Sequence, residues 1–336
     1  MSLPAGINTL LKDITIDYLL ITTRSINAVF PGKRNPEYLI VYTDDDTVKM
    51  TSPGNRGWMQ HTGIVVRSVL TGMLLVFAGT IPRNILFAAN LSYFPAFPWA
   101  VPLMAVYLFF FWRYCNGKGA PQSTAAERKY SMRAYPLKTR IWGWSLLAGI
   151  MGIVTLVIAL HLLNRMVVLP QQQLPDMKHV PDSTVLTLLL AGAPVAGIVE
   201  EIAFRGYMQG PIEQRWGIIA AILITGTMFA VAHLDFTLIL WPYYVAVAAI
   251  YGTVTYLTNS ILPAIVLHTA GNLYSNLDLW LHGQAEWQAG TKPEQLIWQS
   301  GIDSSFLLLG GIFILSLLIT IWLYRRLAVA VRRSFP

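Results

Sequence analysis

The sequence predicts an all-α fold, a polytopic membrane bundle of about eight transmembrane helices, on three observations. Hydrophobic residues make up 54% of the 336-residue chain and charged residues only 12%. The mean hydropathy is +0.51. Apolar stretches near the ~20 residues that a bilayer requires recur along most of the chain. Because soluble domains typically carry about 25% charged residues, an ordinary soluble fold is excluded.

Residues 1–60 differ from the rest and are predicted to be a non-membrane N-terminal region of unknown role. They contain six basic and six acidic residues with scattered Pro and Gly. Residues 38–42 and 47–50 flank an acidic run, which suggests a short hairpin. A polar tail on the membrane surface fits the same residues equally well. Residues 61–336 are predicted to form one transmembrane bundle.

Eight apolar stretches of this bundle are predicted to be membrane-spanning helices because each approaches the length that a bilayer requires. Their ranges are 62–81, 93–112, 141–162, 184–206, 217–233, 237–257, 261–281 and 304–324. The turn between the fourth and fifth is expected near Trp216 and Gly217, with the fourth helix continuing past Gly206.

Basic residues in the connecting segments orient these helices. Seven Lys or Arg and one acidic residue lie in 113–140, and four Arg follow residue 324. Such segments belong on the cytoplasmic side of a membrane. We therefore expect an integral protein of a bacterial cytoplasmic membrane with both termini cytoplasmic. Since these bases account for the net charge of +7, a lipid bilayer is the implied partner and no nucleic acid is.

Two adjacent carboxylates, Glu200 and Glu201, and the guanidinium of Arg205 lie within an otherwise apolar stretch. An ionisable group at bilayer depth costs about 2.5–3.5 kcal/mol on insertion scales, so three together indicate a functional site unless they neutralise one another. On a helix Glu201 and Arg205 share a face, whereas Glu200 is turned by about 100°. We therefore expect Glu201 to pair with Arg205 and Glu200 to stay free.

Further polar residues recur at a four-residue spacing, which places both members of a pair on one helix face. His233 follows Phe229 and Asn272 follows His268 in this way. We expect Phe229 to pack beneath His233, and His268 and Asn272 to point into one cavity. Glu200 and His233 each lie about sixteen residues from the expected turn, so the two residues should sit at the same depth.

A lone intramembrane His or Asn is more often a structural hydrogen-bond partner. Two Glu, two His and one Asn at one depth, however, supply a base, polarising donors and metal ligands together. The chain contains no His-Glu-x-x-His, no Gly-x-Ser-x-Gly and no Gly-rich phosphate loop, which disfavours serine catalysis and nucleotide chemistry. The single cysteine, Cys115, excludes a disulfide framework and a cysteine metal site.

These residues form three ordered motifs. They are Glu200-Glu201-x-x-x-Arg205, Phe229-x-x-x-His233 and His268-x-x-x-Asn272. In type and order the motifs resemble those of the CPBP family of intramembrane proteases, which includes the Abi proteins and the type II CAAX prenyl endopeptidases. The resemblance covers about residues 184–281 and implies an all-helical intramembrane endopeptidase acting on a membrane-associated peptide or protein.

In the mechanism that the resemblance implies, Glu200 and His233 activate a water, and His268 and Asn272 stabilise the oxyanion. Whether a metal takes part stays open. Glu200, His233 and His268 could hold zinc with one position left for water, and members of the family are often labelled metalloproteases. A Glu–His pair can also activate water unaided, and Asn272 suits an oxyanion better than zinc. We favour a reaction without an obligatory metal.

Two other classes of function fit the same residues. Buried Glu and His also mark proton relays and solute transporters, although the two-fold internal repeat common in transporters is not found here. A non-catalytic membrane partner, such as an immunity protein against a peptide toxin, is the other alternative.

Overall fold

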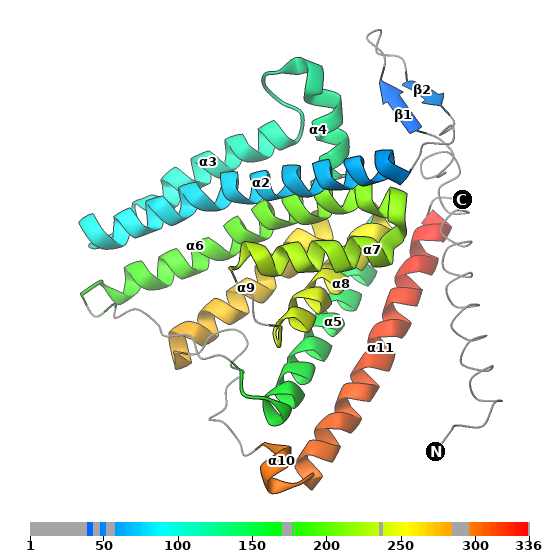
Figure 1. Cartoon of the computed structure of the whole chain (residues 1–336). Helices are drawn as coiled ribbons and strands as arrows, with labels where there is room; N and C mark the ends of the chain where they lie inside the picture. Colours follow the sequence, from blue (N-terminus) through cyan, green and yellow to red (C-terminus); the bar gives the residue numbers. More distant parts are fainter. Residues whose placement is uncertain are drawn as a thin grey trace, which may run out of the picture.

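The computed structural model describes residues 39–42, 48–51, 58–169, 177, 179–234, 238–283 and 296–334, which form a bundle of helices and one small hairpin (Figure 1). In the hairpin β1 (Leu39–Tyr42) pairs antiparallel with β2 (Val48–Thr51). The predicted hairpin is thus confirmed. The other residues of the expected N-terminal region up to Gly57 lie outside the described residues.

The helices follow the apolar stretches of the sequence. In chain order they are α2 (Trp58–Tyr93), α3 (Ala100–Cys115), the 3₁₀ turn η1 (Gln122–Thr124), α4 (Ala125–Met132), α5 (Thr139–Met166), α6 (Asp182–Glu200), the π-helical η2 (Glu201–Met208), α7 (Gln209–Ala232), α8 (Trp241–Thr258), α9 (Leu262–His282), α10 (Ile297–Ser300) and α11 (Ser304–Ser334). Each of the eight predicted spans overlaps one of these helices or helical runs.

Length and composition support fewer spans than eight. Within the described part of the chain four helical segments are long and apolar enough to cross a membrane, namely His61–Tyr93, Thr139–Met166, Asp182–Ala232 and Ser304–Ser334. The all-helical membrane-protein class is therefore supported, whereas the count of eight remains a prediction.

The first two spans meet at a different place from the one predicted. We expected a connection after residue 81, but α2 continues through Pro82 to Tyr93. The turn lies at its end because buried Asn90 organises it: the amide Nδ2 donates to the carbonyls of Phe94 and Phe97 at 3.0 Å, and the backbone N–H of Ala100 donates to Oδ1 at 2.9 Å.

The fourth and fifth predicted spans form the centre of the bundle. From Asp182 the chain is helical through α6, η2 and the start of α7, and it reverses at Gly217. Gly217 has φ 81° and ψ 170°, a conformation that glycine adopts readily because it lacks a Cβ. The predicted turn is thus confirmed, as is the continuation of the fourth helix past Gly206.

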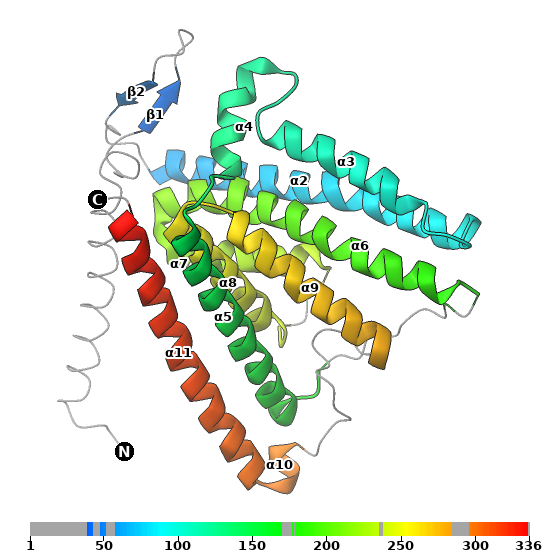
Figure 2. The ribbon, with the colours of Figure 1, turned by 180° about the vertical axis from the view of Figure 1, so that it is seen from behind.

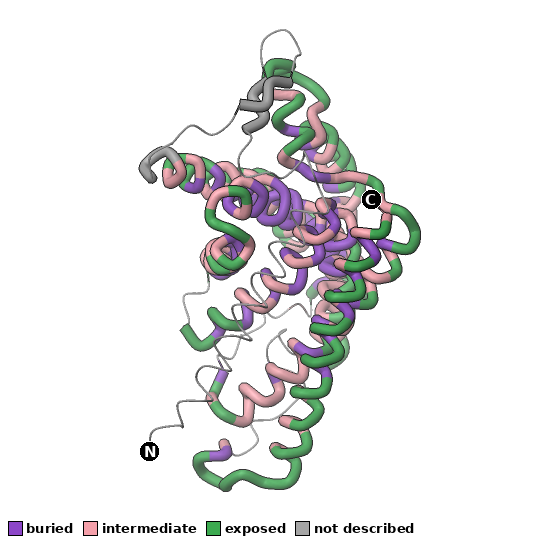
Figure 3. Tube along the Cα trace, turned by 90° about the vertical axis from the view of Figure 1, so that its right-hand side faces the viewer, coloured by how far each residue is buried: buried purple, intermediate pink, exposed green. Residues whose placement is uncertain are grey.

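Packing places η2 in the most enclosed part of the molecule. Helix α6 lies beside α9, α7 beside α8, α5 beside α11, and α2 crosses η2 and α7 (Figures 1 and 2). Every residue of η2 except Tyr207 is buried. Buried residues gather in the upper half of the bundle in Figure 3, whereas much of α11 is exposed. Exposed Leu, Ile and Phe on α2, α3 and α11 give the outside an apolar surface suited to lipid.

Residues 113–140, expected to be a cytoplasmic loop, pack against the bundle instead of lying free. Arg133, just after α4, forms a buried ion pair with Glu213 at 2.9 Å. The Arg133 guanidinium also donates to Oδ1 of Asn259 at 3.2 Å and to the carbonyl of Arg205 at 3.4 Å. This segment therefore covers η2 and holds it from outside the cavity.

Candidate active site

The carboxylate of Glu201 is completely buried and has two neighbours, an imidazole and a guanidinium. Nδ1 of His268 lies 2.8 Å from Glu201 Oε1, and Nε of Arg205 lies 3.4 Å from Glu201 Oε2. The predicted Glu201–Arg205 pair is confirmed. Three aromatic rings surround the Arg205 guanidinium at 5.7–5.8 Å, those of Phe204, Phe229 and Tyr251. Desolvated cations are stabilised by such rings.

The carboxylate of Glu200 approaches the other side of the same imidazole. Its Oε2 lies 3.7 Å from Nε2 of His268, so Glu200, which we expected to stay free, has an imidazole as its neighbour. The physical reason is local backbone geometry. Glu200 ends α6 and Glu201 begins η2, and the wider π-helical turn departs from the regular 100° step assumed from the sequence. Adjacent carboxylates therefore reach the two nitrogens of one ring.

His233 is held by a hydrogen bond within its own chain segment. It follows the last residue of α7, and its Nδ1 lies 2.8 Å from the carbonyl of Phe229. Since a carbonyl only accepts, Nδ1 carries the hydrogen, and in the neutral ring Nε2 then has a lone pair. The imidazole packs on Phe229 at 4.6 Å and Tyr244 at 5.4 Å between ring centroids. The predicted packing of Phe229 beneath His233 is confirmed.

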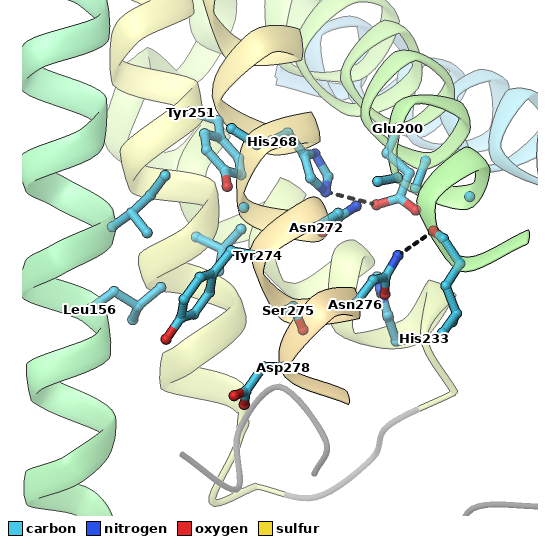
Figure 4. Close-up of a pocket in the computed structure, with 18 of the residues that line it drawn as sticks. Leu156, Glu200, His233, Tyr251, His268, Asn272, Tyr274, Ser275, Asn276 and Asp278 are labelled. Carbon is cyan, nitrogen blue, oxygen red and sulfur yellow. Dashed lines mark hydrogen bonds and ion pairs between the residues drawn. The ribbon is translucent and has the colours of Figure 1, made fainter. Parts of the chain in front are cut away.

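One cavity of about 820 Å³ connects these groups. It is lined by Glu200, His233, His268 and Asn272, as well as by many apolar side chains of α2, α5, α6, α8 and α9. In Figure 4 His268 and Asn272 project from α9 toward Glu200. The expectation that His268 and Asn272 share a cavity is confirmed. The arrangement offers a carboxylate, the Nε2 atoms of two imidazoles and a side-chain amide to a single ligand.

Comparison with protein families supports what the motifs suggest. Residues 182–274 match the family model described as type II CAAX prenyl endopeptidase Rce1-like. This segment of the chain is therefore similar to that family and is called the Rce1-like segment below. No curated protein and no solved structure matches the chain. The Rce1-like segment begins with α6 and ends within α9, so it contains all three motifs. The match supports a membrane-embedded endopeptidase of CAAX type in general.

The zinc ligands considered from the sequence do not assemble in the Rce1-like segment. Nowhere in the described ranges do three His, Cys, Asp or Glu side chains come close enough to hold a metal ion. Glu200, His233 and His268 line one cavity without forming such a group. These three residues therefore do not fit a zinc centre, and no step below passes through one.

Two residues that line the cavity beside the Rce1-like motifs were missed from the sequence. Tyr251 of α8 stacks on His268 with 5.0 Å between ring centroids and 14° between planes. Nothing in the sequence distinguished Tyr251 as a site residue, because an aromatic residue in an apolar helix is common. Arg83 of α2 also lines the cavity. Its signal was present in the sequence, since a cation within an apolar span is rare.

Proposed function

We propose that the chain is an intramembrane endopeptidase that hydrolyses a peptide bond of a membrane-associated protein or peptide. The observation that carries this proposal is the meeting of Glu200, His233, His268 and Asn272 in one cavity, with His268 held between two carboxylates. The family match adds independent support, because all four residues fall within it.

The proposed reaction assigns the proton transfers to Glu200 and the orientation of the attacking water to His233. Glu200 accepts a proton from water while the water oxygen bonds to the scissile carbonyl carbon. His233, whose Nε2 has a lone pair, accepts a hydrogen bond from that water and orients it. As the carbon–nitrogen bond breaks, the proton passes from Glu200 to the leaving amine. General acid–base catalysis of this kind contributes about 10²–10⁴-fold.

His268 and Asn272 are proposed to stabilise the oxyanion. Glu201 accepts a hydrogen bond from Nδ1 and so fixes the ring, leaving Nε2 directed into the cavity toward Glu200. When His268 is protonated, the charges of Glu200, Glu201, Arg205 and His268 sum to zero, which favours their joint burial. A donor of this kind, with the Asn272 amide beside it, can stabilise a carbonyl oxygen as charge develops.

Purified protein in detergent, given quenched membrane-anchored peptides, tests the proposal. Glu200→Gln and His233→Ala should each lower the cleavage rate by about 10²–10³-fold or more. His161→Ala is a matched control, because His161 makes the same local bond, from Nδ1 to the carbonyl of Val157 at 2.8 Å. It should cleave like the parent.

Equal cleavage by the parent and by both cavity variants would overturn the proposal. Solute flux in proteoliposomes that depends on Glu200 without any cleavage would favour the transporter class instead. Protection against a peptide toxin that survives Glu200→Gln would favour the non-catalytic partner.

A further inference from the structure

Arg83 brings a positive charge to the cavity from outside the family-matched segment. It lies within α2, in a segment apolar enough to span a membrane. A cation at such depth is costly and is normally paired or functional. Within the described ranges no carboxylate lies within ion-pair distance of Arg83. Its hydrogen bonds go to the neutral amide oxygen of Asn84, from Nε at 3.1 Å and from Nη2 at 3.0 Å.

The packing of α2 on α6 places Arg83 about one helical turn from the level of the Glu200 carboxylate. Any side chain on Gly79 would collide with Val199, so α2 touches α6 directly before Glu200. Further along α2, Phe87 reaches Gly192, where an added Cβ would lie 3.7 Å from its ring. Arg83 stands midway between Gly79 and Phe87, four residues from each, and therefore on the same helix face.

Two roles are open to a guanidinium at this place. It could stabilise the Glu200 carboxylate, with which it interacts electrostatically, or it could bind an anionic group of the ligand. The first role would normally be served by direct contact, yet Arg83 and Glu200 make no ion pair in the described structure. Because Asn84 engages Nε and one side of Nη2, the Nη1–Nη2 edge remains available. This edge binds carboxylates in a bidentate manner.

The charge distribution of the cavity favours a ligand with one negative group. Asp278, another acidic residue in the lining, already pairs with His282 at 2.7 Å. Most of the other side chains that line the cavity are apolar. Arg83 therefore has no acidic partner within ion-pair distance in the described structure and can bind a carboxylate of the ligand.

Building on the proposed function, we propose that Arg83 is a specificity-determining residue that binds a carboxylate of the peptide substrate close to the scissile bond. The carboxylate comes either from the free C-terminus of the peptide or from an Asp or Glu side chain. Both present the same two oxygens to the guanidinium, so the experiment separates the sources by substrate.

Three quenched peptides with one common scissile site test this assignment. The first ends in a free carboxylate and has no internal acid, the second is its C-terminal amide, and the third is the amide with one Glu near the scissile bond. The parent should cleave the first or the third with a kcat/KM about tenfold or more above that of the second. The peptide that shows the preference identifies the source of the carboxylate.

Variants of Arg83 should change this ratio. Arg83→Gln should bring the ratio of kcat/KM between the acidic peptide and the amide toward one, through a higher KM for the acidic peptide. Arg83→Lys should keep part of the preference for the acidic peptide, and Arg83→Glu should reverse that preference. Arg67→Gln is a control on the same helix, because Arg67 is exposed and contacts Glu127 at 3.5 Å. It should retain the ratio of the parent.

Each remaining result counts against the assignment. If the parent cleaves all three peptides equally, or if Arg83→Gln slows all three by the same factor, Arg83 does not select a carboxylate. Equal slowing of all three peptides by Arg83→Gln would mean that Arg83 acts on Glu200 instead. If the parent cleaves none of the peptides, the proposed function fails, and this inference fails with it.

Discussion

Glu200 and Glu201 contact opposite nitrogens of His268, but only Glu201 also pairs with Arg205. The two carboxylates should therefore respond differently to loss of charge. Glu200→Gln keeps the size of the side chain and should abolish cleavage while the thermal unfolding midpoint stays close to that of the parent. Thermal unfolding and peptide cleavage, measured on the same detergent preparations, test this.

Glu201→Gln should lose folded protein as well as activity. It leaves Arg205 buried without a carboxylate, and breaking a buried pair costs about 3–5 kcal/mol. The same substitution removes the acceptor that fixes Nδ1 of His268. A stable but inactive Glu201→Gln beside an active Glu200→Gln would reverse the two assignments.

At the level of helices, the contact between α2 and α6 sets the distance of Arg83 from Glu200 and Glu201. Gly79→Ala should force the helices apart, because its Cβ would collide with Val199. Overpacking of this kind costs about 1–3 kcal/mol. Gly63→Ala on the same helix meets no neighbour and should be neutral or slightly stabilising. Thermal unfolding of both variants checks the contact, and equal midpoints would contradict it.

The junction between α5 and α11 should respond to acid. Arg165 donates to Asp303 at 2.7 Å, and Asp303 accepts the backbone N–H of Phe306 at the start of α11. These bonds lower the pKa of Asp303 below its usual 3.8. Because the folded pKa is the lower one, the stabilisation is complete above the usual value and declines as the pH falls through the folded pKa. Asp303→Asn should therefore flatten the dependence of the unfolding midpoint on pH below about 4.

Some parts of the site could be predicted from sequence because they depend on neighbours within one helix. The pairing of Glu201 with Arg205 and the packing of Phe229 against His233 both follow from a four-residue spacing. The contact of Glu200 with His268 could not be predicted in this way. It depends on the π-helical turn of η2 and on the packing of α9 against this part of the chain, neither of which a four-residue spacing indicates.

For the molecule as a whole, the predicted orientation can be tested at two exposed positions. Lys118 and Gln299 are exposed in the structure, and five predicted spans separate them. They should therefore face opposite sides of the membrane. The sole cysteine, Cys115, is buried and should not react in the folded protein.

A membrane-impermeant thiol reagent provides the measurement. Gln299→Cys should be labelled in intact cells, whereas Lys118→Cys should be labelled only after the membrane is opened. Labelling of both positions in intact cells would require an even number of spans between them, and the count of eight with cytoplasmic termini would then be wrong.

Arg133 contributes both to the charge bias of its segment and to the packing around η2, two properties that are usually independent in a membrane protein. As one of seven bases in residues 113–140, Arg133 belongs to the charge bias from which we predict the orientation of the chain. The same guanidinium pairs with buried Glu213 and donates to the backbone of Arg205. Removing this charge to invert the chain would also leave buried Glu213 without its cationic partner beside η2. At this position, the orientation of the chain cannot be tested without disturbing the packing around η2.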